Sequence, residues 1–88
     1  MSLDKVLSGV GMTVFVKYYY CFRDKSCEEC IDAISEDYSD KSKRTRISHA
    51  KRIFREGKQR EALEIIISSK KVDAATRIRA EIIIKTGV

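Results

Sequence analysis

Residues 41–57 read KSKRTRISHAKRIFREG, and their pattern sets the expectation for the rest of the fold. Four apolar or small side chains recur there at helical spacing: Ile47, Ala50, Ile53 and Phe54. They fall on about a third of a helix circumference, and Gly57 behind them favours a C-terminal end. Five residues lie on nearly the opposite side: Arg44, Ser48, Lys51, Arg55 and Lys58. The stretch predicts a helix over residues 41–56 with one packing face and one basic face.

The flanking segments predict further short helices. Ser26 and Glu29 have the spacing of a capping box, which begins a helix expected over residues 27–37. A helix over residues 58–69 follows Gly57. Asp73 is expected to cap a last helix over residues 74–85. In that helix we expect four side chains to face inward: Ala75, Ile78, Ile82 and Ile83.

Residues 13–22, TVFVKYYYCF, are compatible with either a strand or a helix. Their β-branched and aromatic side chains favour a strand. The chain offers little β-rich sequence as a partner, so we favour a helix over residues 12–23 and keep the strand as the alternative. On that helix Phe15, Phe22 and Tyr18 or Tyr19 would be buried, and Tyr20 would be exposed.

Length and composition favour one helical domain. The chain has 88 residues, 43% of them apolar, with no proline and four glycines. This apolar share excludes a disordered polyelectrolyte, although 35% of the residues are charged. We expect an all-α fold, a single compact bundle of four or five short helices over residues 1–88. Residues 1–11 form a flexible or hinged N-terminal segment in this interpretation, because Gly9 and Gly11 favour a hinge.

Residues 47–69 locally resemble the hairpin of a tetratricopeptide repeat. Gly57 and Ala62 are five residues apart, as are the small residues at the turn and second helix of that repeat. No second copy is visible at the repeat period, and several copies are normally needed. We therefore interpret the resemblance as two antiparallel helices that pack closely at small residues, not as membership of the family.

Charge is distributed very unevenly along the chain, and this suggests a function. The net charge is +5, but residues 41–60 carry nine basic side chains and one acidic, Glu56, a local net of +8. Nucleic acids attract such clusters because each neutralised phosphate releases counterions. We hypothesise a small nucleic-acid-binding protein, such as a DNA-binding regulator, with residues 27–37 and 41–56 as a helix-turn-helix-like pair. The sequence does not distinguish DNA from RNA as the partner. The expected contacts are Arg44, Arg46, Ser48, Lys51, Arg52, Arg55 and Lys58.

A helical protein-interaction module is the alternative hypothesis. Residues 1–40 carry eight acidic and four basic side chains, a net of −4. This acidic half could pair with the basic helix within one chain or across a homodimer. Apolar residues 65–67 and 82–84 also exceed what one face of a short helix buries, and such a surplus often marks an interface. An adaptor or inhibitor, self-associating as a homodimer, would have no role with nucleic acid. A plainly solvated basic face is the third reading.

Three cysteines and one histidine provide a weak candidate metal site. Cys27 and Cys30 are spaced C-x-x-C, with Cys21 upstream and His49 downstream, the ligand types of a structural zinc site. A single C-x-x-C is a weak signal, however, and Cys30 is also explained as a core residue. The odd cysteine count fits a reducing compartment better than a disulfide framework. We expect no bound metal and no redox role.

The remaining function classes find little support in the sequence. There is one histidine, no serine–histidine–aspartate arrangement and no glycine-rich phosphate loop, so we expect no enzymatic activity, cofactor or small-molecule substrate. The apolar stretch over residues 6–22 contains Lys17 and two glycines and is too short to span a bilayer. We expect no membrane partner and a cytoplasmic protein.

Overall fold

A computed structural model describes residues 2–87. Seven α-helices follow one another there, and no β-strand occurs in that range, which confirms the all-α class. The expectation was four or five helices, so two or three more are present in the described residues. Their bounds are α1 Leu3–Val10, α2 Met12–Lys17, α3 Tyr19–Asp24, α4 Cys27–Ala33, α5 Asp40–Arg55, α6 Gln59–Ser68 and α7 Ala74–Thr86.

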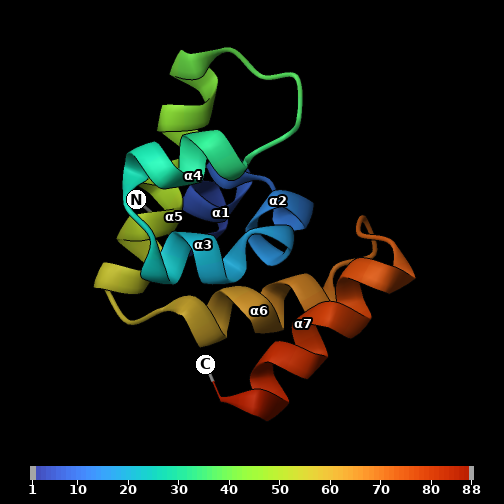
Figure 1. The fold of residues 1–88 in the computed structure, drawn as a ribbon. Coiled ribbons are helices and arrows are strands. Elements are labelled where there is room, and N and C mark those ends of the chain that lie inside the picture. The colour runs from blue at the N-terminus through green and yellow to red at the C-terminus, as the bar shows by residue number, and fades with distance from the viewer. Residues whose placement is uncertain (1, 88) are drawn as a thin grey trace.

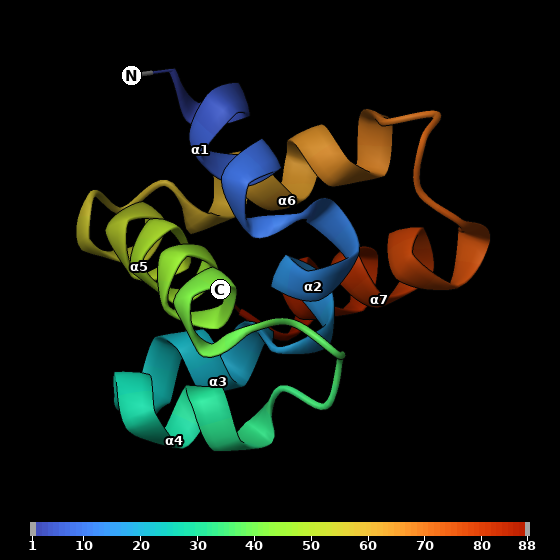
Figure 2. The same cartoon turned by 90° about the horizontal axis from the view of Figure 1, so that it is seen from above.

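Helix α5 organises one half of the bundle. It packs against α1 on one side and against α3 and α4 on another (Figures 1 and 2). Helices α6 and α7 form a pair that closes the lower side of the molecule in Figure 1. Contacts of α1 with α6 and of α2 with α7 join the two parts. The Cα radius of gyration is 11.9 Å, with extents of 30 × 25 × 25 Å.

Residues 3–10 form the first additional helix. The Ser2 hydroxyl caps α1 by accepting from the Lys5 N–H at 3.4 Å. Val6, Leu7 and Val10 are buried, so this segment contributes to the core. Gly11 then has φ = 93°, a conformation that strains other residues, and it turns the chain into α2.

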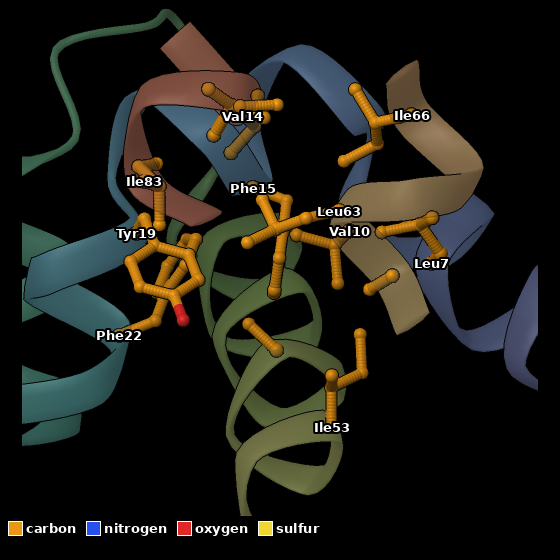
Figure 3. Packing of buried hydrophobic residues seen from close by; sticks show 14 of the residues in the cluster. Leu7, Val10, Val14, Phe15, Tyr19, Phe22, Ile53, Leu63, Ile66 and Ile83 are labelled. Atoms are coloured by element: carbon orange, nitrogen blue, oxygen red, sulfur yellow. The ribbon is translucent and has the colours of Figure 1, made fainter. Parts of the chain in front are cut away.

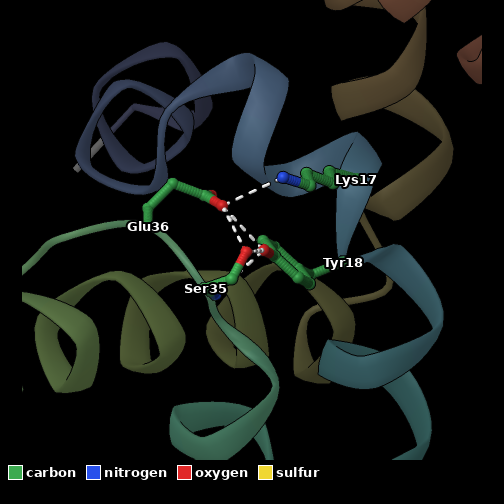
Figure 4. A network of polar contacts seen from close by, with 4 residues as sticks. All are labelled: Lys17, Tyr18, Ser35 and Glu36. Carbon is green, nitrogen blue, oxygen red and sulfur yellow. Dashed lines mark hydrogen bonds and ion pairs between the residues drawn. The ribbon is translucent and has the colours of Figure 1, made fainter.

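Residues 12–23 are helical, as predicted, but they form two helices instead of one. Tyr18 departs from helical dihedral angles, with φ −111° and ψ 24°, and separates α2 from α3. Its hydroxyl donates to Glu36 Oε1 at 2.7 Å and accepts from the Ser35 N–H at 3.2 Å. Lys17 Nζ donates to the same Glu36 oxygen at 3.0 Å (Figure 4). The network ties this break to the loop that follows α4.

Side-chain caps define the later helices much as the sequence predicts. The capping box is present: Ser26 Oγ accepts from the Glu29 N–H, and the Glu29 carboxylate accepts from the Ser26 N–H, both at 3.2 Å. Asp73 caps α7 by accepting from the Thr76 N–H at 3.0 Å. Helix α4 ends at Ala33, four residues before the expected end, because Ile34 adopts an extended conformation and is buried in the core.

The aromatic residues of α2 and α3 fill the centre of the core (Figure 3). Phe15, Tyr19 and Phe22 are almost fully buried, which confirms the inward face expected for this stretch. The ring centroid of Phe15 lies 5.7 Å from those of Tyr19 and Phe54. Burial of each such side chain stabilises the fold by roughly 1.5–3 kcal/mol. Aliphatic side chains from the other helices surround them: Leu7, Val10, Ile53, Leu63, Ile66 and Ile83.

The close antiparallel pairing expected across Gly57 is not found. Gly57, with φ = 69°, follows the end of α5, but α6 then packs mainly on α7 and has few contacts with α5. The apolar face of α5 is instead covered largely by α1, α3 and α4. The hairpin prediction was wrong because it considered only neighbours in the sequence.

No helix within residues 2–87 combines the length and the apolar character needed to cross a membrane.

Candidate functional site

The cations of α5 were the expected contacts with nucleic acid, and several of them bind their own chain. Arg44 is exposed and forms an ion pair with Glu28 of α4, with Nη1 2.9 Å from Oε1. Arg52 pairs with Glu56 one turn later, with Nε 2.8 Å from Oε2. Lys58 Nζ lies 3.9 Å from the other oxygen of Glu56. These pairs reduce the charge that the helix presents to a polyanion.

Arg46 points into the protein. Its Nη1 donates to the Val10 carbonyl oxygen at 2.7 Å, and its guanidinium carbon lies 4.1 Å from the ring centroid of Tyr38. A cation over an aromatic face is stabilised by the ring quadrupole. Arg46 is therefore a structural residue that joins α5 to the end of α1.

Lys51 also has a structural role. Its ammonium donates to the carbonyl oxygens of Phe22 at 3.2 Å and Lys25 at 2.5 Å. Both carbonyls belong to the C-terminal end of α3, where helices leave acceptors unpaired. A positive charge at this end also complements the helix dipole. Lys51 thus caps α3 from a neighbouring helix.

Ser48 and Arg55 are exposed. Together with Lys51 they line a shallow depression of about 510 Å³ between α5 and α3–α4. Arg23 and the half-buried Phe54 also line it. Arg23 was not among the predicted contacts, because all of these belong to the basic stretch over residues 41–60. Its Nε lies 2.9 Å from Oδ1 of the adjacent Asp24.

The helix-turn-helix expectation fits the geometry poorly. The connection between α4 and α5 covers residues 34–39 and is therefore longer than the three- or four-residue turn typical of that motif. Helix α4 has seven residues. Tyr38 within the connection packs against Arg46, so the loop is part of the fold.

The four candidate zinc ligands do not form a cluster. His49 faces α1, since a Cβ added to Gly9 would lie 2.9 Å from its Cδ2 atom. The cysteines belong to α3 and α4, and the Sγ of Cys30 donates to the Cys21 carbonyl oxygen at 3.2 Å. Burial raises the pKa of Cys30 to about 11, which opposes thiolate formation. Within residues 2–87 no three His, Cys, Asp or Glu side chains are placed to hold a metal ion.

A groove of about 780 Å³ lies between α7 on one side and α2 with the start of α3 on the other. Three large hydrophobic side chains are exposed in the described part of the chain: Tyr20 at 47%, Ile78 at 55% and Ile82 at 54%. All three line this groove. The buried side chains Val16 and Ile83 contribute to its apolar wall.

The charged side chains that line the groove are all basic. Lys17 and Arg79 line it, whereas no aspartate or glutamate among the described residues does. Lys17 is partly neutralised by Glu36. Arg79 is exposed and forms no ion pair within residues 2–87. Arg23 lies with its guanidinium carbon 4.9 Å from the Tyr20 ring centroid, but it is paired with Asp24 and adds no unpaired charge.

Sequence reasoning predicted the exposure of Tyr20 and the bounds of α7 to within one residue, but it assigned the wrong inward face to α7. Ala75, Ile78 and Ile82 were expected inward, yet they are exposed, and of the four predicted residues Ile83 alone is buried. The inward face also includes Thr76 and Ala80. Apolar residues occur around much of the circumference of α7, so their spacing does not select the buried face. That excess of isoleucine was the available signal that a second face is apolar.

No protein family, no curated protein and no solved structure matches this chain.

Proposed function

We propose that this protein is an interaction module that binds an apolar segment of another polypeptide in the groove between α2 and α7. The observation that carries the proposal is the convergence of Tyr20, Ile78 and Ile82 on one groove. Exposed apolar patches on small domains commonly mark interaction sites, because leaving them in water costs free energy.

The dimensions of the groove support this function. Along α7 the groove extends from Ala75 to Ile83, which is enough for about two turns of a bound helix. Ile78 and Ile82 are one helical turn apart, which matches the repeat with which a partner helix presents its apolar side chains. The isoleucines account for much of the apolar surface, so their removal should abolish binding without unfolding the core.

Titration of isotope-labelled protein with short amphipathic helical peptides tests the proposal. We expect amide NMR shifts to change along α7 and around Val16 and Tyr20. The double variant Ile78→Ser, Ile82→Ser should lose this response while its circular dichroism spectrum is retained. A Lys70→Ser, Lys71→Ser variant serves as the control, because both lysines are exposed in the loop before α7. Unchanged peptide binding in the isoleucine variant would contradict the proposed site.

Nucleic-acid binding is a second candidate function, favoured by the depression that Arg23, Ser48, Lys51 and Arg55 line. Phosphates could be bound there by the exposed Arg55. Arg44 lies near the start of α5 and Lys58 beyond its end, and each is paired with a glutamate that a phosphate would have to displace. Fluorescence anisotropy with a labelled duplex and a labelled single strand, at low and moderate salt, tests it. Binding that weakens steeply with salt and is lost in Arg44→Glu, Arg55→Glu would support this function. Arg46 and Lys51 are unsuitable for this test because they hold the fold together.

A further inference from the structure

We infer that the occupant of the groove is an acidic amphipathic helix of a partner protein, with apolar side chains on one face and Asp or Glu beside them. This inference rests on the proposed function and specifies the chemistry of its partner.

The shape matches about two turns of helix. The groove follows α7 from Ala75 to Ile83, a rise of about 12 Å at 1.5 Å per residue. Ile78 and Ile82 provide two apolar contacts one turn apart on this wall, and Val16 and Tyr20 provide the facing wall. A partner helix that presents apolar residues at spacings of three and four would fill the space between them.

The charged side chains that line the groove indicate which polar side chains the partner helix should carry. Lys17 and Arg79 come from opposite walls, but the ammonium of Lys17 is paired with Glu36 at 3.0 Å. Arg79 forms no ion pair with residues 2–87 and is available to a carboxylate. An acidic side chain beside the apolar stripe would pair with Arg79, whereas a basic one would be repelled.

A second copy of the chain fits less well. A two-fold dimer brings the same patch of each protomer together. Two concave grooves facing one another would leave unfilled space, and Arg79 of each copy would approach a surface that is lined by cations and no carboxylate. Both effects oppose self-association through this site, so we expect the free protein to be monomeric at micromolar concentration.

Three synthetic helical peptides of about 15 residues, long enough to form helix, test the inference. They share one leucine face and differ in their polar face, which carries Glu, Gln or Lys. We expect the Glu peptide to bind at least about tenfold more tightly than the Lys peptide at low salt, with a smaller ratio at high salt. Arg79→Glu should reduce or reverse this preference. The matched control is Arg60→Glu, an exposed cation on α6 outside the groove, which should leave the preference unchanged.

The outcomes separate the inference from the proposed function. Equal binding of all three peptides, lost in Ile78→Ser, Ile82→Ser, would overturn the acidic partner and leave the docking groove intact. Absence of binding by every peptide would overturn both. Sedimentation equilibrium is run in parallel. A dimer that dissociates in the isoleucine variant would identify a second copy as the occupant and overturn the inference.

Discussion

Arg46 Nη1 donates a 2.7 Å hydrogen bond to the main-chain carbonyl oxygen of Val10. Val10 is the last residue of α1, where helix carbonyls carry partial negative charge, so the guanidinium is favourably placed. The same group stacks on Tyr38 in the loop before α5. One arginine of the basic helix therefore connects the end of α1, the loop before α5 and α5 itself.

Arg46→Ala should lower the free energy of unfolding by about 1–2 kcal/mol, since a hydrogen bond from a charged donor is lost and the Val10 carbonyl loses its partner. Urea denaturation followed by circular dichroism measures the change. Arg55→Ala is the matched control: Arg55 is exposed on the same helix, and its removal should change stability by less than about 0.5 kcal/mol. Equal losses in the two variants would refute the structural role of Arg46.

Tyr19 should tolerate the loss of its hydroxyl. The side chain is fully buried, and its hydroxyl has no hydrogen-bond partner in the described part of the chain. Burial raises the pKa of this phenol, as expected for a group removed from water. Tyr19→Phe keeps the aromatic packing and removes a desolvated polar atom. We expect unchanged stability or a gain of about 1 kcal/mol in thermal or urea unfolding. A loss of that size would show that the hydroxyl has a partner after all.

Acid should destabilise the fold. Hydrogen bonds at the Ser26 backbone and side chain lower the pKa of Glu29, and those from Thr76 lower the pKa of Asp73. The hydrogen bond and charge of Arg52 do the same for Glu56. A carboxyl group whose pKa is lower in the folded than in the unfolded state stabilises the fold at pH values above its unfolded-state pKa of about 4. This stabilisation is lost as the pH falls through its folded-state pKa.

Urea unfolding between about pH 5 and pH 3 measures this loss. In Asp73→Asn the helix cap is retained, because Asn also caps well, while the titrating carboxyl is gone. Its stability should therefore depend less steeply on pH than that of the unmodified protein. A fold whose stability stays constant or rises over this range would contradict the assignment.

The three cysteines should differ in reactivity. Cys30 is fully buried, and burial raises its pKa to about 11, whereas Cys21 and Cys27 are half-buried. Alkylation requires the thiolate and access to it. At about pH 8, iodoacetamide should therefore modify Cys21 and Cys27 well before Cys30, as measured by peptide mass spectrometry over time. Denatured protein, in which all three should react at similar rates, is the control. Early modification of Cys30 in the folded protein would contradict its burial.

Much of the local structure was predictable because its determinants are close in the sequence. The Ser26–Glu29 capping box, the Asp73 cap and the inward face of α5 depend on residues within one or two turns. The exposure of Tyr20 followed from the same helical geometry. The break at Tyr18 was not predictable, because it is accompanied by hydrogen bonds to Ser35 and Glu36, seventeen and eighteen residues away.

By itself, the sequence determined an all-α chain, most of its helix starts and the concentration of positive charge on α5, since these depend on composition, spacing and short-range hydrogen bonds. Tertiary structure alone decided which cations remain exposed. Arg46 and Lys51 meet carbonyls of α1 and α3, which local patterning does not place nearby. It also decided which apolar face of α7 is buried. Both faces carry isoleucine, so packing against α6 and α2 selects Ile83 and leaves Ile78 and Ile82 to form the groove.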